Sequence, residues 1–197
     1  MLSAILVQPR EFALAGLAIL GALLTAAVWH DARTYRIPNA IVVTGVGVAL
    51  AMHTFLSPPG TGLAGAAPGP LGLSYALGGL LVGLVPVLLL YFANAAGAGD
   101  AKLMGMTGAF LGPVDALGAL LATAIAGIAL ALICAIRAGV ARRMLANMAL
   151  IGYSMLARLT ATAGPSFDAR QDTAAKVPYS IAIAAGTAIW MAVRYSI

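Results

Sequence analysis

The sequence predicts an all-α, polytopic integral membrane protein with about six transmembrane helices, the fourth of them short. The first observation is composition: 62% of the 197 residues are hydrophobic and only 9% are charged, against about 25% charged residues in ordinary soluble domains. The second is the distribution of apolar residues. They form six runs, most of them close to the length of about 20 residues that a helix needs to cross a bilayer. We expect residues 1–197 to form a single membrane-embedded domain.

The apolar runs define the elements in order. They cover residues 12–29, 37–56, 73–94, 101–112, 114–136 and 177–194. The first run is too long for the apolar core of a typical secretory signal and follows no basic cluster, so we expect an uncleaved span. The fourth run is only about 18 Å long as a helix, and glycine-rich segments bound it, which predicts a short helix. The Pro- and Gly-rich stretch 57–72 is predicted to be an external loop.

One segment allows two arrangements. Residues 144–163 either lie along the membrane as an interfacial helix or cross it, which would invert the last helix. We favour the interfacial helix, because it preserves the bias of positive charge toward one side of the membrane. The residues that follow, up to 176, then form a polar cytoplasmic loop.

Charge sets the orientation and excludes one class of partner. The net charge is +5, but the basic residues form no face or stripe, so we do not expect nucleic-acid binding. With the N-terminus outside, nine of the eleven basic residues face the cytoplasm, and only Arg10 and Arg194 lie outside. The cytoplasmic ones are Arg33, Arg36, Lys102, Arg137, Arg142, Arg143, Arg158, Arg170 and Lys176.

Two acids stand out in this apolar chain. Asp31 occurs in "WHDARTYRIPN" and Asp100 in "GAGDAKLMG", and the predicted orientation brings both to the cytoplasmic side at similar depth. An acid at membrane depth is costly and is by default a functional hypothesis. Two adjacent carboxylates share one proton, so that one accepts a proton from water while the other polarises a carbonyl, as peptide hydrolysis requires. Such a pair titrates as a unit, which leaves the separate roles open.

The residues beside Asp100 have physical reasons of their own. Gly97 and Gly99 permit backbone angles and close approaches that a side chain would forbid. Asp100 at a helix start either meets the positive end of the helix dipole or caps the helix. Lys102 does not share the helical face of Asp100, so we interpret it as an interface anchor.

The segment after Asp31 predicts a tight turn. Pro38 suits the first turn of a helix, and Ile37 before it is held extended. Asn39 caps or orients this helix. Arg33 and Arg36 bind either lipid phosphates or substrate.

The other polar residues predict no metal or cofactor. His30 has no partner at ligand spacing, and His53 is expected to be structural. The single cysteine, Cys134, permits no internal disulfide and no cysteine-rich zinc site. Asp115 is expected at an external helix start.

Three segments together resemble the type IV prepilin peptidases, which are membrane aspartic proteases with a GxGD signature. "GAGDAKL" is similar to their Gly-x-Gly-Asp-x-Lys motif, and "DARTYRIPN" is similar to their motif of an Asp followed by Ile-Pro-Asn. "VPYSIAIAAG" at 177–186 resembles the start of their last span. The resemblance covers most of the chain, and the two main motifs in this order are highly specific.

This resemblance implies an aspartic endopeptidase. It would remove the short basic leader from prepilins and pseudopilins at the cytoplasmic face of a bacterial inner membrane, typically after a glycine, without a cofactor. Asp31 and Asp100 match the two catalytic aspartates of the family. The supporting motif residues are Gly97, Gly99, Lys102, Ile37, Pro38 and Asn39. Substrate pilins and membrane lipids are the implied partners.

The chain departs from the larger members of that family, which carry an extra cytoplasmic segment with paired cysteines and also methylate the new N-terminus. No CxxC occurs here, so we do not expect methyltransferase activity, and the short form resembles the peptidases of tight-adherence pilus systems. A proton-coupled transporter with the acids as a relay is the main alternative, although the acids lie at span ends. A non-catalytic partner of a pilus assembly machinery is a second.

Overall fold

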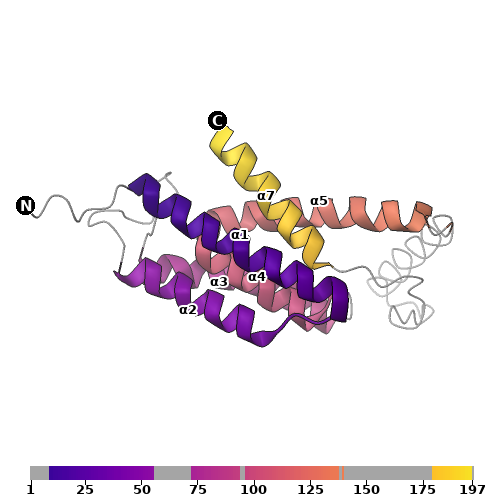
Figure 1. Cartoon of the computed structure of the whole chain (residues 1–197), viewed down its shortest axis with the longest axis horizontal. Helices are drawn as coiled ribbons and strands as arrows, with labels where there is room; N and C mark the ends of the chain where they lie inside the picture. Colours follow the sequence, from indigo (N-terminus) through magenta and orange to yellow (C-terminus); the bar gives the residue numbers. More distant parts are fainter. Residues whose placement is uncertain (1–8, 56–71, 94–95, 138, 140–178, 197) are drawn as a thin grey trace, which may run out of the picture. The chain divides into compact units, whose positions relative to one another are not determined.

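The computed structural model describes residues 9–55, 72–93, 96–137, 139 and 179–196. All secondary structure in these residues is helical, which confirms the predicted fold class (Figure 1). The helices are α1 (Pro9–Thr34), α2 (Asn39–Phe55), α3 (Leu73–Phe92), α4 (Ala98–Leu111), α5 (Pro113–Arg137) and α7 (Ser180–Ser196). Residues 57–71 of the predicted loop and the segment 144–163 lie outside the described residues.

Three of the described helices are long and apolar enough to cross a membrane. They are Leu14–Thr34, Leu73–Phe92 and Pro113–Arg137, and the apolar helices Asn39–Phe55 and Ser180–Arg194 are shorter. Large hydrophobic side chains such as Leu81, Leu89 and Ile125 are exposed on them. A helix that exposes such side chains over its length needs an apolar solvent, which agrees with a polytopic membrane protein.

The chain divides into two compact units, residues 1–126 with 178–197, and residues 127–177. The first unit contains α1 to α4, α7 and the first half of α5, and it holds every residue of the predicted site. Of the second unit, the structure describes the last turns of α5 and residue 139.

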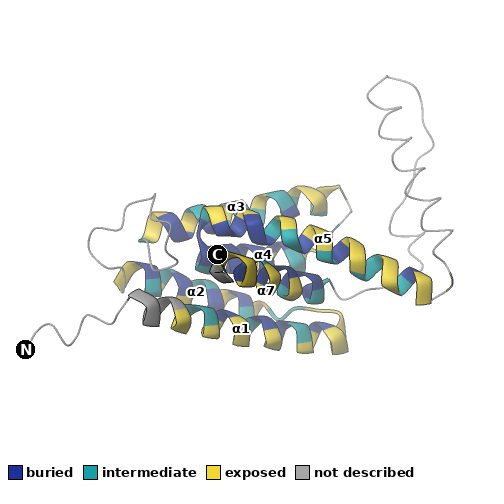
Figure 2. Ribbon diagram, turned by 90° about the horizontal axis from the view of Figure 1, so that it is seen from above, coloured by how far each residue is buried: buried dark blue, intermediate teal, exposed yellow. Residues whose placement is uncertain are grey.

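Helix α4 forms the centre of the first unit, as its predominantly buried ribbon shows (Figure 2). It packs against α1, α2, α3 and α7, most extensively against α3. The side chains of Leu103, Met104 and Met106 are fully buried. The predicted short fourth helix is therefore an internal element of 14 residues, enclosed by its neighbours.

Glycines allow this close packing between α3 and α4. A Cβ at Gly79 would collide with the carbonyl oxygen of Gly108, and a Cβ at Gly83 with that of Met104. Small residues let helix backbones approach in this way in membrane proteins. At the far end of α4, Gly112 has a φ of 80°, and the ring of Tyr75 fills the space that its Cβ would need.

Candidate active site

Asp31 lies in the last turn of α1, which continues past the apolar run that predicted it. Asp31 is buried, with 7% of its surface exposed. The helix ends where Tyr35 adopts a φ of 50° and donates its N–H to the carbonyl of Asp31 at 2.8 Å. Pro38 then accepts the N–H of Ile41 at 3.1 Å in the first turn of α2. The predicted tight turn is present and presents Asp31 to the interior.

Asp100 lies in the first turn of α4. The N-cap is Gly97, with extended backbone angles, and Asp100 Oδ2 accepts the Gly97 N–H at 3.1 Å. Asp100 is thus not the N-cap itself but supplies one half of a capping box. This bond fixes the carboxylate at the head of the central helix.

Burial governs the protonation of Asp100, which lies at the terminus of α4 and outside the three helices of spanning length. Burial raises the pKa of its carboxyl to about 6; the Gly97 N–H opposes this shift and the negative charge of Asp31 adds to it. The charge effect shows that the two acids are electrostatically coupled. No hydrogen bond joins the two side chains, both of which the structure describes.

The start of α7 contacts Asp31. Ser180, fully buried, donates its hydroxyl to Asp31 Oδ2 at 2.6 Å. Burial raises the pKa of the Tyr179 phenol, and the negative charge of Asp100 raises it further. The helices α1, α4 and α7 all contact one another, and they bring two acids that are 69 positions apart in the sequence to the same end of the helices.

The supporting motif residues lie at the same end of the helices. Lys102 Nζ donates to Asn39 Oδ1 at 3.1 Å across an exposed gap between α4 and α2. A Cβ at Gly99 would lie 3.4 Å from Ile37 Cδ1, so the glycine-rich head of α4 packs on the turn after α1. Together these contacts join the two motifs into one site.

The arginines after Asp31 face outward. Arg33 and Arg36 are exposed, and the guanidinium of Arg33 lies 4.0 Å from the ring centroid of Trp29. This cation–π contact keeps the positive charge on the surface and away from the buried acid.

Ser180 is the residue that the sequence did not single out. The segment 177–186 resembled the start of the last span in the peptidase family, and that resemblance was the available signal. A serine at the start of an apolar run is otherwise ordinary, and its partner Asp31 lies 149 residues earlier.

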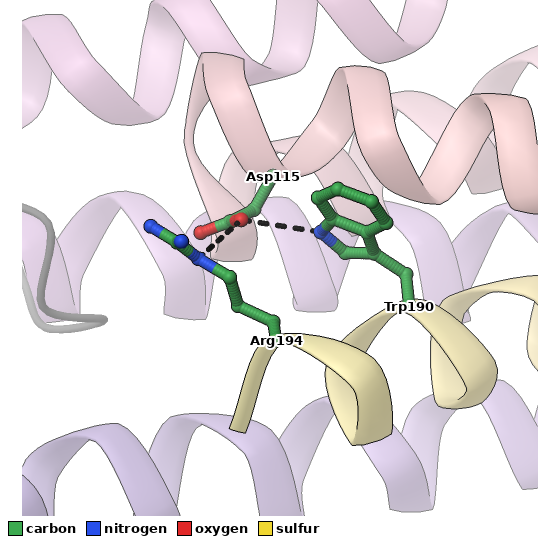
Figure 3. A network of polar contacts seen from close by, with 3 residues as sticks. All are labelled: Asp115, Trp190 and Arg194. Atoms are coloured by element: carbon green, nitrogen blue, oxygen red, sulfur yellow. Dashed lines mark hydrogen bonds and ion pairs between the residues drawn. The ribbon is translucent and has the colours of Figure 1, made fainter. Parts of the chain in front are cut away.

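Another buried acid, Asp115, lies elsewhere and has a structural environment. Asp115 Oδ1 accepts the indole N–H of Trp190 at 3.1 Å and lies 3.5 Å from Arg194 Nε (Figure 3). The predicted helix-start position is confirmed, because Asp115 is in the first turn of α5. His53 is also buried, with Nε2 at 3.3 Å from the carbonyl oxygen of Phe110. Among the described residues, no three His, Cys, Asp or Glu side chains form a group that could hold a metal ion.

The fold and this site define a helical membrane protein with two coupled acids at one end of its central helix. The family model of the type IV leader peptidases matches residues 18–132, more than half of the chain, and the chain belongs to this family. The matched range contains Asp31 and Asp100. No curated protein and no solved structure matches the chain.

Proposed function

We propose that this protein is an aspartic-type endopeptidase that removes the short basic leader from type IV prepilins. The observation that carries the proposal is the convergence of Asp31 and Asp100 at one end of the helices: the charge of Asp31 raises the pKa of Asp100, and Asp31 accepts a hydrogen bond from Ser180 at the start of α7. A structural acid needs only one partner, whereas two neighbouring acids that interact supply a proton donor and a proton acceptor together.

The chemistry follows from one shared proton. The ionised carboxylate takes a proton from water, and the water oxygen forms a bond to the scissile carbonyl carbon. The protonated carboxyl gives its proton to the carbonyl oxygen, which yields a tetrahedral diol. The C–N bond then breaks as the nitrogen receives the proton taken from water, and a diol hydroxyl returns a proton to the other carboxylate. Acid and amine products leave, and the pair regains its single proton.

The location of the site suits a prepilin substrate. By the positive-inside bias, the end that carries Asp31, Asp100, Lys102 and Arg33 faces the cytoplasm. A prepilin would leave its apolar helix in the bilayer of the inner membrane and present its leader to this end. Of the known pilus classes, we assign the tight-adherence class, because the chain has no paired cysteines; pseudopilins are further substrates.

Co-expression with candidate prepilins tests the function. Wild-type protein is expected to shorten the pilin, measured by mass spectrometry of its N-terminus. Asp31→Asn and Asp100→Asn are each expected to reduce cleavage at least about a hundredfold, the usual contribution of acid–base catalysis. A chelator is expected to leave the rate unchanged.

The same variants separate the protease from a proton-coupled transporter. If both aspartate variants still process the pilin, the two-aspartate mechanism is wrong. A transporter would change the pH of sealed vesicles and leave the pilin intact. Cleavage of the pilin by the wild type and by neither aspartate variant supports the peptidase function.

A further inference from the structure

We propose that Trp29, Arg33 and Arg36 form a binding site for the phosphate of an anionic phospholipid, at the end of α1 that carries Asp31. The three residues flank Asp31 in the sequence, yet all three are exposed whereas Asp31 is buried. The sequence leaves lipid phosphate and substrate as alternatives for the two arginines, and the structure favours the lipid. The inference goes beyond the proposed peptidase function, and its test needs no pilin.

This end of α1 lies at the depth of the lipid headgroups. The apolar part of the helix, Leu14–Thr34, has 21 residues and is about 31 Å long, close to the thickness of about 30 Å of the hydrocarbon core. Its last turn therefore reaches the polar layer of the bilayer. Trp29, which is 59% exposed, suits this level because its ring is apolar and its N–H is polar.

The two arginines are held near one another by local structure. Trp29 and Arg33 lie one turn apart on the same face of α1, and the guanidinium carbon of Arg33 lies 4.0 Å from the ring centroid. This contact restricts the long side chain without neutralising its charge. Arg36 follows in the turn after the helix, where the Thr34 hydroxyl lies within hydrogen-bond distance of the carbonyl oxygens of His30, at 2.8 Å, and Arg36, at 3.2 Å.

Both arginines are available to an anion. Within the part of the chain that the structure describes, neither guanidinium forms an ion pair. The acids at this end do not neutralise them, because Asp31 and Asp100 each accept a hydrogen bond from another residue. A guanidinium presents a planar set of N–H donors that matches the oxygens of a phosphate. The chemistry of the site therefore fits a phosphate group.

The charge of the site favours a lipid over the substrate leader. The leader of the proposed substrate is basic, so Arg33 and Arg36 would repel it. Anionic lipid headgroups have the opposite charge and lie at the depth of the site, where each Lys or Arg strengthens binding about fivefold. An anionic lipid is favoured over a zwitterionic one, because the zwitterionic headgroup adds a positive charge beside the two guanidinium groups.

Native mass spectrometry of the purified full-length protein in detergent tests the site. The probes are phosphatidylglycerol and phosphatidylcholine with the same acyl chains, and the wild type is expected to bind phosphatidylglycerol more tightly. Arg33→Gln and Arg36→Gln are each expected to weaken this binding about fivefold and to leave phosphatidylcholine binding unchanged. Trp29→Leu releases the Arg33 side chain and should weaken it about two- to fivefold. Arg33→Lys keeps the charge and should bind better than Arg33→Gln.

An exposed arginine at the end of α5 provides the matched control. Arg137→Gln also removes one positive charge and should keep the wild-type affinity. An equal loss in this variant would show a diffuse effect of net charge and would overturn the local site. Unchanged phosphatidylglycerol binding in the double variant of Arg33→Gln and Arg36→Gln would do the same.

A competition experiment separates a lipid from a free anion. Inorganic phosphate at millimolar concentration should leave the bound phosphatidylglycerol in place, because it lacks the acyl chains that anchor the headgroup beside Trp29. Displacement by inorganic phosphate would overturn the lipid as the occupant. None of these measurements depends on cleavage, so failure of the peptidase function would be seen separately, in a wild type that leaves the pilin intact.

Discussion

At the scale of single residues, the raised pKa of Asp100 predicts how pilin cleavage depends on pH. Burial raises the pKa of this carboxyl to about 6, so the acid keeps its proton below that pH and loses it above. Cleavage needs one proton on the pair. We therefore expect log(kcat/KM) to fall with a slope near −1 as the pH rises above about 6, measured by initial rates of pilin processing.

The matched control for this profile is Asp115, an acid that is buried outside the proposed pair. Asp115→Asn removes a carboxylate that Trp190 and Arg194 contact and leaves the proposed pair unchanged. The pH–rate profile of this variant should therefore fall at the same pH as that of the wild type. A wild-type rate that is constant between about pH 5 and 8 would contradict the shared proton.

The hydrogen bond between Lys102 and Asn39 predicts a small loss of kcat/KM when either residue is substituted, and the two losses should not add. It joins the head of α4 to the start of α2 at 3.1 Å, but both side chains are exposed, so its contribution is limited. Lys102→Met and Asn39→Ala are each expected to lower kcat/KM about two- to fivefold. The double variant should lose no more than either single variant, which a double-mutant cycle measures.

Additive losses in that cycle would show that the two residues act independently. A loss of a hundredfold or more for Lys102→Met would indicate direct participation in the chemistry, in place of the anchoring role expected from the sequence.

At the scale of helices, close backbone contact between α3 and α4 holds the central helix in position. Gly83→Ala places a Cβ against the carbonyl oxygen of Met104, so the two helices must separate. We expect a loss of about 1–3 kcal/mol in stability, as overpacked cores show. Thermal unfolding in detergent measures this loss, and cleavage should fall with it.

Gly47→Ala is the matched substitution on α2. Gly47 is exposed in mid-helix, and its Cβ would meet nothing within 4 Å. Alanine has the higher helix propensity by up to about 1 kcal/mol, so this variant should be as stable as the wild type or more stable. Equal destabilisation by both substitutions would show that the contact between α3 and α4 is not the cause.

The helices also show how far hydropathy predicts this fold. Long apolar runs predicted each described helix, and the Gly112–Pro113 pair predicted the break between α4 and α5, because glycine ends helices and proline begins them. Hydropathy did not reveal that α1 continues through the polar residues up to Thr34, or that α4 begins at Ala98. These extensions carry the site, since they contain Asp31 and Asp100.

The candidate site was predictable where a motif marks it. The two acids and the glycines could be identified from local sequence, and the charge bias predicted that the acids lie at the same end. Ser180 could not be identified from local sequence. Its contact with Asp31 depends on the packing of α7 against α1, and a single serine at the start of an apolar run forms no local pattern.

At the scale of the molecule, the first compact unit has two chemically distinct ends. One end carries both acids of the proposed pair, with Lys102 beside Asn39 and Arg33 and Arg36 exposed nearby. The other end carries the Asp115–Arg194 ion pair and His53. Because cytoplasmic loops are enriched in Lys and Arg, this asymmetry predicts that the acids face the cytoplasm.

Thiol accessibility tests this orientation, and the chain suits the experiment because it has one cysteine. In a Cys134→Ala background, Tyr35→Cys in the turn before α2 and Thr54→Cys near its last residue mark opposite ends of this helix, whose 17 residues extend about 26 Å. Both positions are exposed. A membrane-impermeant maleimide should label Thr54→Cys in intact cells and Tyr35→Cys only after the membrane is opened. The reverse pattern would place the acids outside, where the leader of a prepilin never arrives, and would rule out cytoplasmic processing even with the pair intact.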